Sequence, residues 1–104
     1  MTYDCEDLTL AATQPSHIKP TSKGCAECLR SGDSWVHLRL CLACGHVGCC
    51  DDSKNRHATK HNRSTGHPVI HSLESGEAWG YCYPHDAFAE DLPLAGKGTP
   101  SALR

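Results

Sequence analysis

The chain of 104 residues has room for one domain but only a thin apolar core, because its 38% of hydrophobic residues includes eight cysteines. The formal net charge of −2 argues against non-specific binding to nucleic acid, which requires a basic field. Eight cysteines and eight histidines indicate instead that disulfide or metal cross-links support the fold.

The first residues of the sequence bear on which cross-link to expect. Residues 2–6 contain neither a basic stretch nor an apolar run, so they do not look like a secretory signal. No segment has the length of apolar sequence that crosses a membrane. We therefore expect a cytoplasmic protein with reduced thiols, in which close cysteine pairs bind metal.

The pattern of apolar residues predicts an α+β fold. Residues 13–24 are rich in Pro, Ser and Thr, which favours a loop. Apolar and polar residues alternate over 35–40, which predicts a half-buried strand, and we expect a second short strand at 46–49.

A helix is predicted next along the chain. Ser53 is the expected N-terminal cap, and the helix carries His57 and His61 on one face because they are four residues apart. Gly66 is expected to end it, with a proline two residues later.

The last third of the chain holds an aromatic cluster. Residues 68–73 and 79–83 are predicted to be strands, and residues 86–92 a short helix. The Pro- and Gly-containing segment 93–104 is predicted to be a disordered tail, which leaves a domain over residues 1–92.

Two Cys-x-x-Cys pairs, with one further cysteine and three histidines downstream, carry the strongest chemical signal. Two residues between cysteines allow a tight turn to point both thiolates at one tetrahedral ion. The eight candidate ligands are enough for two ions: Cys25, Cys28, Cys41, Cys44, Cys49, His57, His61 and His67. Their spacing alone does not say which ligand belongs to which ion.

A zinc protease is one alternative interpretation. His57 and His61 form the His-x-x-x-His pattern of such enzymes, which place the general base, a glutamate, directly after the first histidine. Ala58 occupies that position here. The sequence therefore argues against protease chemistry.

A DNA-binding finger is a second alternative. Residues 41–61 contain Cys-x2-Cys-x12-His-x3-His, which is the spacing of a two-Cys, two-His finger. The usual core positions of that finger fall on Gly48 and Lys54, however, and neither residue can pack there. Asp51 and Asp52 near the helix start would also repel phosphate.

The run Cys-Leu-Ala-Cys-Gly-His-Val-Gly-Cys, followed by His-x-x-x-His and Thr-Gly-His-Pro, resembles the UBP-type zinc finger, a ubiquitin-binding domain. The resemblance extends over residues 5–90. It implies a small twisted antiparallel sheet with about two short helices packed on it, held by up to three interleaved zinc ions.

The resemblance also implies which ligands share an ion. One set is Cys25, Cys28, Cys49 and His57, and a second set is Cys41, Cys44, His61 and His67. A third set is Cys5, Asp7, Cys82 and His85, in which Asp and His replace the family's His and Cys. We therefore expect two or three structural Zn²⁺ ions per polypeptide, and Cys50 is expected to be a buried thiol without a metal.

Ubiquitin-binding members of this family hold the free C-terminal carboxylate of ubiquitin with an arginine, a tryptophan and nearby aromatic residues. The arginine follows the third cysteine of the family pattern, where this sequence has Asp51, which would repel a carboxylate. Trp35 stands six residues before Cys41, whereas the family spacing is two. The candidate ligand-binding residues are Trp35, Arg39, Arg56, Trp79, Tyr81 and Tyr83.

The sequence therefore predicts a zinc-stabilised recognition module without catalytic activity. Its expected partner is a protein or peptide, and the free C-terminus of a polypeptide, that of ubiquitin included, is one candidate. Neither nucleic acid nor a membrane is an expected partner.

Overall fold

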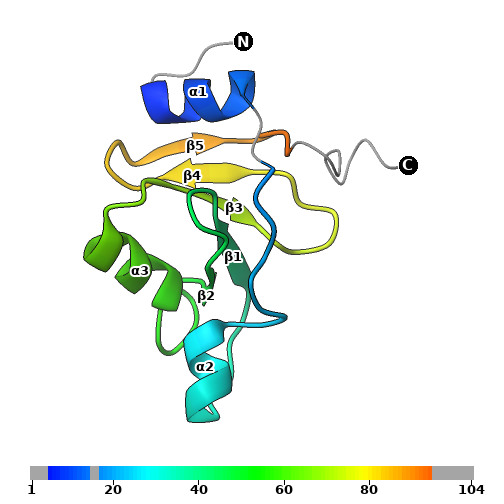
Figure 1. Ribbon diagram of the computed structural model, residues 1–104, viewed down its shortest axis with the longest axis vertical. Helices are drawn as coiled ribbons and strands as arrows, with labels where there is room; N and C mark the ends of the chain where they lie inside the picture. Colours follow the sequence, from blue (N-terminus) through cyan, green and yellow to red (C-terminus); the bar gives the residue numbers. More distant parts are fainter. Residues whose placement is uncertain (1–4, 15–16, 95–104) are drawn as a thin grey trace.

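A five-stranded antiparallel sheet forms the centre of the molecule, with short helices around it (Figure 1). The computed structural model describes residues 5–14 and 17–94. The strands lie in the order β2-β1-β3-β4-β5 and comprise β1 Leu38–Cys41, β2 Val47–Cys49, β3 Val69–Ser72, β4 Gly80–Cys82 and β5 Ala87–Ala89. The helices are α1 Glu6–Thr13, α2 Ala26–Ser31 and α3 His57–Thr65. The predicted α+β architecture is confirmed.

Strands β1 and β2 are joined by a tight turn that contains the second Cys-x-x-Cys pair. The amide of Gly45 donates to the carbonyl of Cys41 at 2.9 Å, and Gly45 has a φ of +83°, which favours glycine. A side chain on Gly45 would also meet the carbonyl oxygen of Lys19 at 2.4 Å. The turn therefore depends on this glycine.

Helix α3 begins at His57, so the prediction that Ser53 caps it is wrong. The Ser53 hydroxyl instead accepts a hydrogen bond from the backbone N–H of Val36 at 2.8 Å. Arg56, with a left-handed φ of 51°, precedes the helix, and Gly66 ends it as expected with a φ of 79°. Residues 50–56 connect β2 to α3 and thereby place His57 beside the sheet.

The predicted helix over residues 86–92 is wrong, because this segment supplies β5. Asp86 adopts a left-handed φ of 49°, which turns the backbone back on itself. Ala87 then pairs with Cys82, and Phe88 pairs with Tyr81. The four other segments predicted as strands match β1 to β4, although β1 starts at Leu38 and leaves Trp35 outside it. Residues 95–104 of the predicted tail lie outside the described part of the protein.

Helix α1 was not predicted, because it buries only one of its residues. Leu8 is fully buried, and it joins a small core with Val69, Cys82, Ala89 and Leu92. The helix therefore packs on one face of the β3-β4-β5 half of the sheet (Figure 1).

The opposite face of that half-sheet presents aromatic side chains. Ile70 on β3 lies opposite Tyr81 on β4, and Tyr81 lies opposite Phe88 on β5. Because side chains alternate between the faces of a sheet, these three lie on the face that α1 does not cover. Among the described residues, no helix is long and apolar enough to span a membrane.

Candidate metal centres and aromatic pocket

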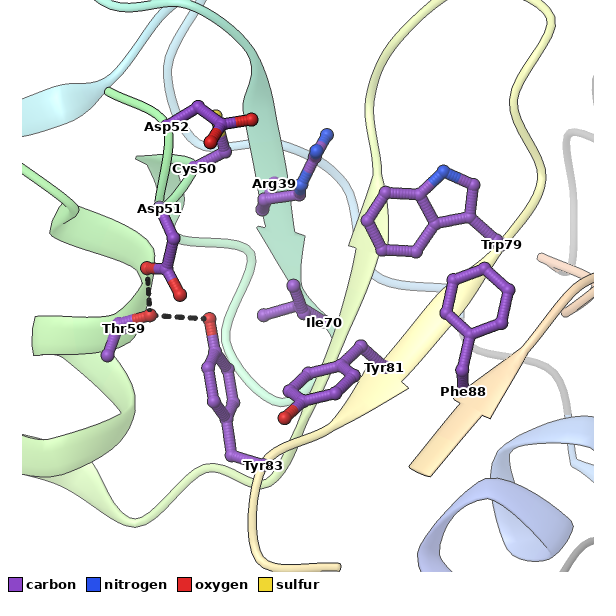
Figure 2. A pocket seen from close by; sticks show the side chains of 10 residues that line it. All are labelled: Arg39, Cys50, Asp51, Asp52, Thr59, Ile70, Trp79, Tyr81, Tyr83 and Phe88. Atoms are coloured by element: carbon purple, nitrogen blue, oxygen red, sulfur yellow. Dashed lines mark hydrogen bonds between the residues drawn. The ribbon is translucent and has the colours of Figure 1, made fainter. Parts of the chain in front are cut away.

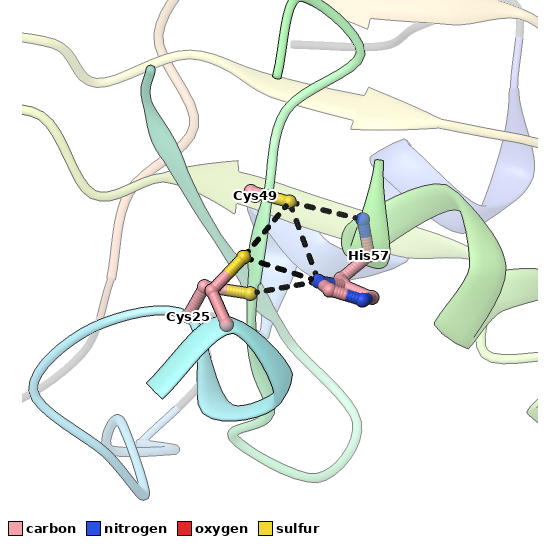
Figure 3. A group of neighbouring side chains, drawn as sticks. Cys25, Cys49 and His57 are labelled. Carbon is pink, nitrogen blue, oxygen red and sulfur yellow. Dashed lines mark hydrogen bonds between the residues drawn. The ribbon is translucent and has the colours of Figure 1, made fainter. Parts of the chain in front are cut away.

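The first Cys/His group is built by α2, β2 and the start of α3. The Nδ1 atom of His57 lies 3.2 Å from Sγ of Cys25, 3.4 Å from Sγ of Cys28 and 3.5 Å from Sγ of Cys49. The last two sulfurs are 4.0 Å apart. Figure 3 shows Cys25, Cys49 and His57 directed toward one point.

The second group joins β1 and the β1–β2 turn to α3 and to His67 in the connection between α3 and β3. Sγ of Cys41 lies 3.4 Å from Nδ1 of His67, and Sγ of Cys44 lies 3.3 Å from Nε2 of His61. The two histidine nitrogens are 3.3 Å apart. Helix α3 thus gives His57 to the first group and His61 to the second.

The third group joins the start of α1 to β4 and to the turn between β4 and β5. Nδ1 of His85 lies 3.1 Å from Sγ of Cys5, 3.3 Å from Sγ of Cys82 and 3.4 Å from Oδ2 of Asp7. The four donor atoms of each of the three groups lie within 4.8 Å of one another. The structure therefore brings together the three sets of ligands that the resemblance implies.

These distances can be tested against a zinc ion. A tetrahedral Zn²⁺ with bonds of about 2.3 Å to sulfur and about 2.0 Å to nitrogen spaces its ligands about 3.3 to 3.8 Å apart. The donor separations given above, from 3.1 to 4.0 Å, lie close to that spacing. The four donor atoms of each group are of the types that zinc prefers.

Burial disfavours the thiolate form of three of these cysteines. Burial raises the pKa of Cys25 and of Cys82 to about 12, and it also raises the pKa of Cys41. No cysteine among the described residues forms a disulfide. A divalent ion at the centre of each group would reverse the effect of burial by stabilising the negative sulfurs.

A glutamate and a histidine connect the first two groups. Both carboxylate oxygens of Glu27, which stands between Cys25 and Cys28 in the sequence, lie 2.8 and 3.0 Å from Nε2 of His46. The ring of His46 stacks on that of His61, with the centroids 4.0 Å apart and the planes at 6°. Partial burial opposes the charge on Glu27, but its hydrogen bonds from His46 and from the backbone together lower its pKa.

The four residues of the alternative DNA-binding finger do not form one group, in line with the sequence argument against it. His57 joins Cys25, Cys28 and Cys49, whereas Cys41 is grouped with His61 and His67. The spacing in the sequence matched such a finger only because the two sets are interleaved along the sequence.

A pocket of about 450 Å³ opens on the aromatic face of the sheet (Figure 2). Its wall includes four of the six candidate ligand-binding residues, Arg39, Trp79, Tyr81 and Tyr83. The guanidinium of Arg39 lies over the Trp79 ring, 4.4 Å from its centroid, and the Tyr81 and Tyr83 rings meet edge to face at 5.1 Å. The remaining lining residues are Cys50, Asp51, Asp52, Thr59, Ile70 and Phe88.

The other two candidate ligand-binding residues lie elsewhere. Trp35 is partly buried against the first Cys/His group, and a side chain on Gly24 would meet its ring at 2.6 Å. Arg56 lines another depression beside α3, which shares Asp51 and Thr59 with the aromatic pocket. Sequence reasoning missed Phe88 as a lining residue, because a helix was expected there and only its pairing with Tyr81 places it in the wall.

Known proteins resemble parts or most of this sequence. Ubiquitin carboxyl-terminal hydrolase 16 of Mus musculus is 46% identical over 50 residues, which cover 45% of this chain and 6% of that protein. Histone deacetylase 6 of Caenorhabditis elegans is 32% identical over 72 residues, which cover 69% of this chain and 7% of that protein. The match thus spans only a small part of the length of these curated relatives.

A solved structure and a family model extend the comparison. The solution NMR structure of protein RPA1320 from Rhodopseudomonas palustris has a TM-score of 0.75 and 43% identity, and the match covers 96% of this chain and 91% of that one. The model of the family described as "Zn-finger in ubiquitin-hydrolases and other protein" matches residues 25–94. Together with the Cys/His groups, this match shows that the chain belongs to the zinc fingers of ubiquitin hydrolases and other proteins.

Proposed function

We propose that the protein is a recognition module in which structural zinc ions hold the sheet and the aromatic pocket binds the free C-terminal end of a protein. The observation that carries this proposal is the convergence of Arg39 with Trp79, Tyr81 and Tyr83 on one open pocket. Arg39 comes from a different strand, about forty residues earlier in the sequence, so the fold itself assembles the pocket.

The metal in this proposal has a structural role in all three groups. Each group supplies four protein donors, which complete the tetrahedral coordination of Zn²⁺ and leave no position for a reactive water. The ions would hold the β1–β2 turn against α3. Arg39 lies on β1 and Asp51 in the connection between β2 and α3, so both belong to the part of the chain that these ions join. Zinc binding thereby supports recognition without taking part in chemistry.

Arg39 is suited to hold a carboxylate. Its Nη1 group donates to the carbonyl of Leu38 at 3.0 Å and lies 3.5 Å from the hydroxyl of Ser72, which fixes the side chain over Trp79. The other N–H groups of the guanidinium remain available for a forked, charge-assisted contact with a carboxylate. The flat rings of Tyr81 and Tyr83 offer apolar walls on which a peptide backbone can lie.

Ubiquitin is the first protein to test as the partner. The matched family is described by its occurrence in ubiquitin hydrolases, and one relative is named as a ubiquitin carboxyl-terminal hydrolase. In this protein Asp51 stands where the family pattern has its arginine, so Arg39 would have to supply the positive charge from β1.

The test is an NMR titration of the isotopically labelled, zinc-loaded protein with ubiquitin. We expect the amide signals of the pocket residues and the indole signal of Trp79 to shift, and the shifts to vanish with ubiquitin that lacks its last two residues. Arg39→Gln should abolish the shifts, whereas Arg30→Gln on the exposed part of α2 should retain them. Binding of neither ubiquitin nor any short peptide with a free carboxylate would refute the proposal.

A further inference from the structure

The outer face of α3 carries a cluster of positive charge. Four of the ten lysine and arginine residues of the chain lie within residues 54–63, and this stretch contains no acidic residue. Arg56, Lys60 and Arg63 follow one another at intervals of four and three residues, which places them on one face of the helix. Ala58, the buried residue of α3, lies on the other side, toward the sheet (Figure 1). The three cations line one depression of about 340 Å³ and form what we call the basic face of α3.

The charges of the basic face have no partner in the part of the protein that the structure describes. The side chains of Arg56, Lys60 and Arg63 are exposed, and none of them forms an ion pair with residues 5–14 or 17–94. A fourth cation in the wall of the same depression, Lys54, differs from them, because it lies 3.5 Å from Oδ1 of Asp33. Three positive charges on one face therefore remain to be neutralised by something outside the domain.

The positions of these charges work against the stability of the helix. Like charges three or four residues apart repel one another on a helix surface. Arg56 and Lys60 also lie near the N-terminal end of α3, where the helix dipole disfavours cations, and the first turn contains no acidic residue. An anion bound on the basic face would relieve both effects. The arrangement therefore suits the binding of an anion better than it suits an isolated helix.

Acidic residues at the border of the basic face restrict the kind of anion. Asp51 lines the depression on the side of the aromatic pocket, and Asp33 lies beside Lys54. A nucleic acid carries a phosphate on every nucleotide and would bring some of these charges against the two carboxylates. A protein segment presents fewer charges over a shorter length.

The dimensions of the basic face fit such a segment. From Arg56 to Arg63 the helix rises by about 10 Å. An extended segment with acidic side chains at alternate positions spaces them about 7 Å apart on one side. Two or three carboxylates of one short segment can therefore pair with the three cations.

We propose that the basic face of α3 is a second protein-binding surface, which takes a short acidic segment of a partner. The guanidinium groups of Arg56 and Arg63 fork onto its carboxylates, and Lys60 contributes a point charge between them. The depression shares Asp51 and Thr59 with the aromatic pocket, so the two surfaces adjoin. The contact needs no free C-terminus, and the inference therefore stands apart from the proposed function of that pocket.

The test uses an octapeptide in which glutamate alternates with serine, acetylated and amidated so that neither end is charged. A counterpart carries glutamine in place of each glutamate. Affinity is measured by NMR titration of the isotopically labelled, zinc-loaded protein in about 20 mM and about 150 mM salt. We expect the glutamate peptide to shift the amide signals of residues 56–63 and to bind about fivefold more weakly at the higher salt. The glutamine peptide should cause no such shifts.

Two double variants with the same change in net charge connect the binding to the basic face. Lys60→Gln with Arg63→Gln alters two exposed positions of α3, retains helix propensity, and should weaken binding about five- to tenfold at low salt. Arg56 is left unchanged because it precedes a donor of the first Cys/His group. The matched control, Lys23→Gln with Arg30→Gln, removes two exposed cations outside the basic face and should change the affinity by less than about twofold.

A charge-reversed variant gives a second, independent readout. Lys60→Glu with Arg63→Glu should lose the glutamate peptide and instead bind an analogue with lysine at the same positions, because the complementarity is then reversed. If the variant binds neither peptide while its amide dispersion is native, the contact is not one of charge pairing on this face, and the inference fails.

Other outcomes would also overturn the inference. Equal losses in the two glutamine double variants would mean that the peptide responds only to overall charge. Equal binding of the glutamate and glutamine peptides would remove the role of the carboxylates. Tighter binding of inorganic phosphate or of an eight-nucleotide DNA strand to the same residues would assign the face to phosphate. None of these results bears on the aromatic pocket, because the peptides have no free C-terminal carboxylate.

Discussion

The first two Cys/His groups and the third differ in how the fold brings their donors together. The first two draw on residues 25–67, and α3 gives one histidine to each. The third joins Cys5 to His85, which are 80 residues apart. The interleaved pair therefore shares its supporting elements, whereas the third group closes a long loop and attaches one helix. We therefore expect the loss of an ion from the interleaved pair to disturb more of the fold than the loss of one from the third group.

Removal of a ligand from the interleaved pair should have the largest effect. Cys41→Ser takes a sulfur from the second group, and structural zinc contributes on the order of 10 kcal/mol in small zinc domains. That exceeds what a core this thin supplies, so we expect the variant to unfold. The loss of amide dispersion in a ¹H–¹⁵N spectrum measures this, and a fully folded Cys41→Ser protein would contradict the two-ion arrangement.

Cys50→Ser is the matched control for that variant. Cys50 is also buried, with 5% of its surface exposed, but it belongs to none of the three groups. Its sulfur lies 3.5 Å from the hydroxyl of Ser53, a contact that a serine can retain. The variant should keep the native spectrum and the zinc content.

Removal of a ligand from the third group should have a smaller and more local effect. Cys5→Ser should release α1 from β4 while the sheet and the interleaved groups stay intact, because their donors come from other elements. We expect one zinc fewer per polypeptide by elemental analysis and the collapse of the amide signals of residues 6–13. An unchanged zinc content would show that this group holds no ion.

The same contrast explains how much of the site could be predicted. The close spacing of Cys25 with Cys28 and of Cys41 with Cys44 marks metal binding in the sequence itself, because ligands on one tight turn need no knowledge of the fold. Asp7 and His85 gave a weaker signal, since Asp and His replace the family's residues and only the fold brings the two together.

The fold was less predictable where non-local pairing decides the structure. Residues 86–92 were predicted to be helical, yet pairing with β4 makes Ala87–Ala89 a strand. Helix α1 has one buried residue, Leu8, so its sequence lacks a clear apolar face. Phe88 and Asp52 enter the pocket through strand register and loop path, which local patterns do not encode.

The close approach of β2 to α3 gives a third test of the contrast between the interleaved Cys/His groups and the third group. A side chain on Gly48 would lie 2.6 Å from the backbone nitrogen of Ala58, which cannot move without α3. Gly48→Ala should push His57 away from Cys49 and cost about 1–3 kcal/mol. Chemical denaturation measures the loss, and the signals of residues 6–13 should not shift. An unchanged midpoint of unfolding would show that the helix yields without cost.

The smallest effect is expected at the contact that connects the interleaved groups. Glu27→Gln removes the charge that orients His46, and His46 stacks on His61 of the second group. Because such supporting contacts tune metal affinity, we expect zinc transfer to a chelator to be about tenfold faster from the interleaved groups. The third group, which Glu27 does not contact, should release its zinc at the original rate.

Glu74→Gln provides the matched control for this prediction. Glu74 also pairs with a histidine, His37, at 3.5 Å, but neither residue belongs to the Cys/His groups. If both variants speed zinc release equally, the effect reflects general loosening of the fold. If only Glu27→Gln does, and the first and second groups lose their ions together, then the contact between Glu27 and His46 couples the two sites.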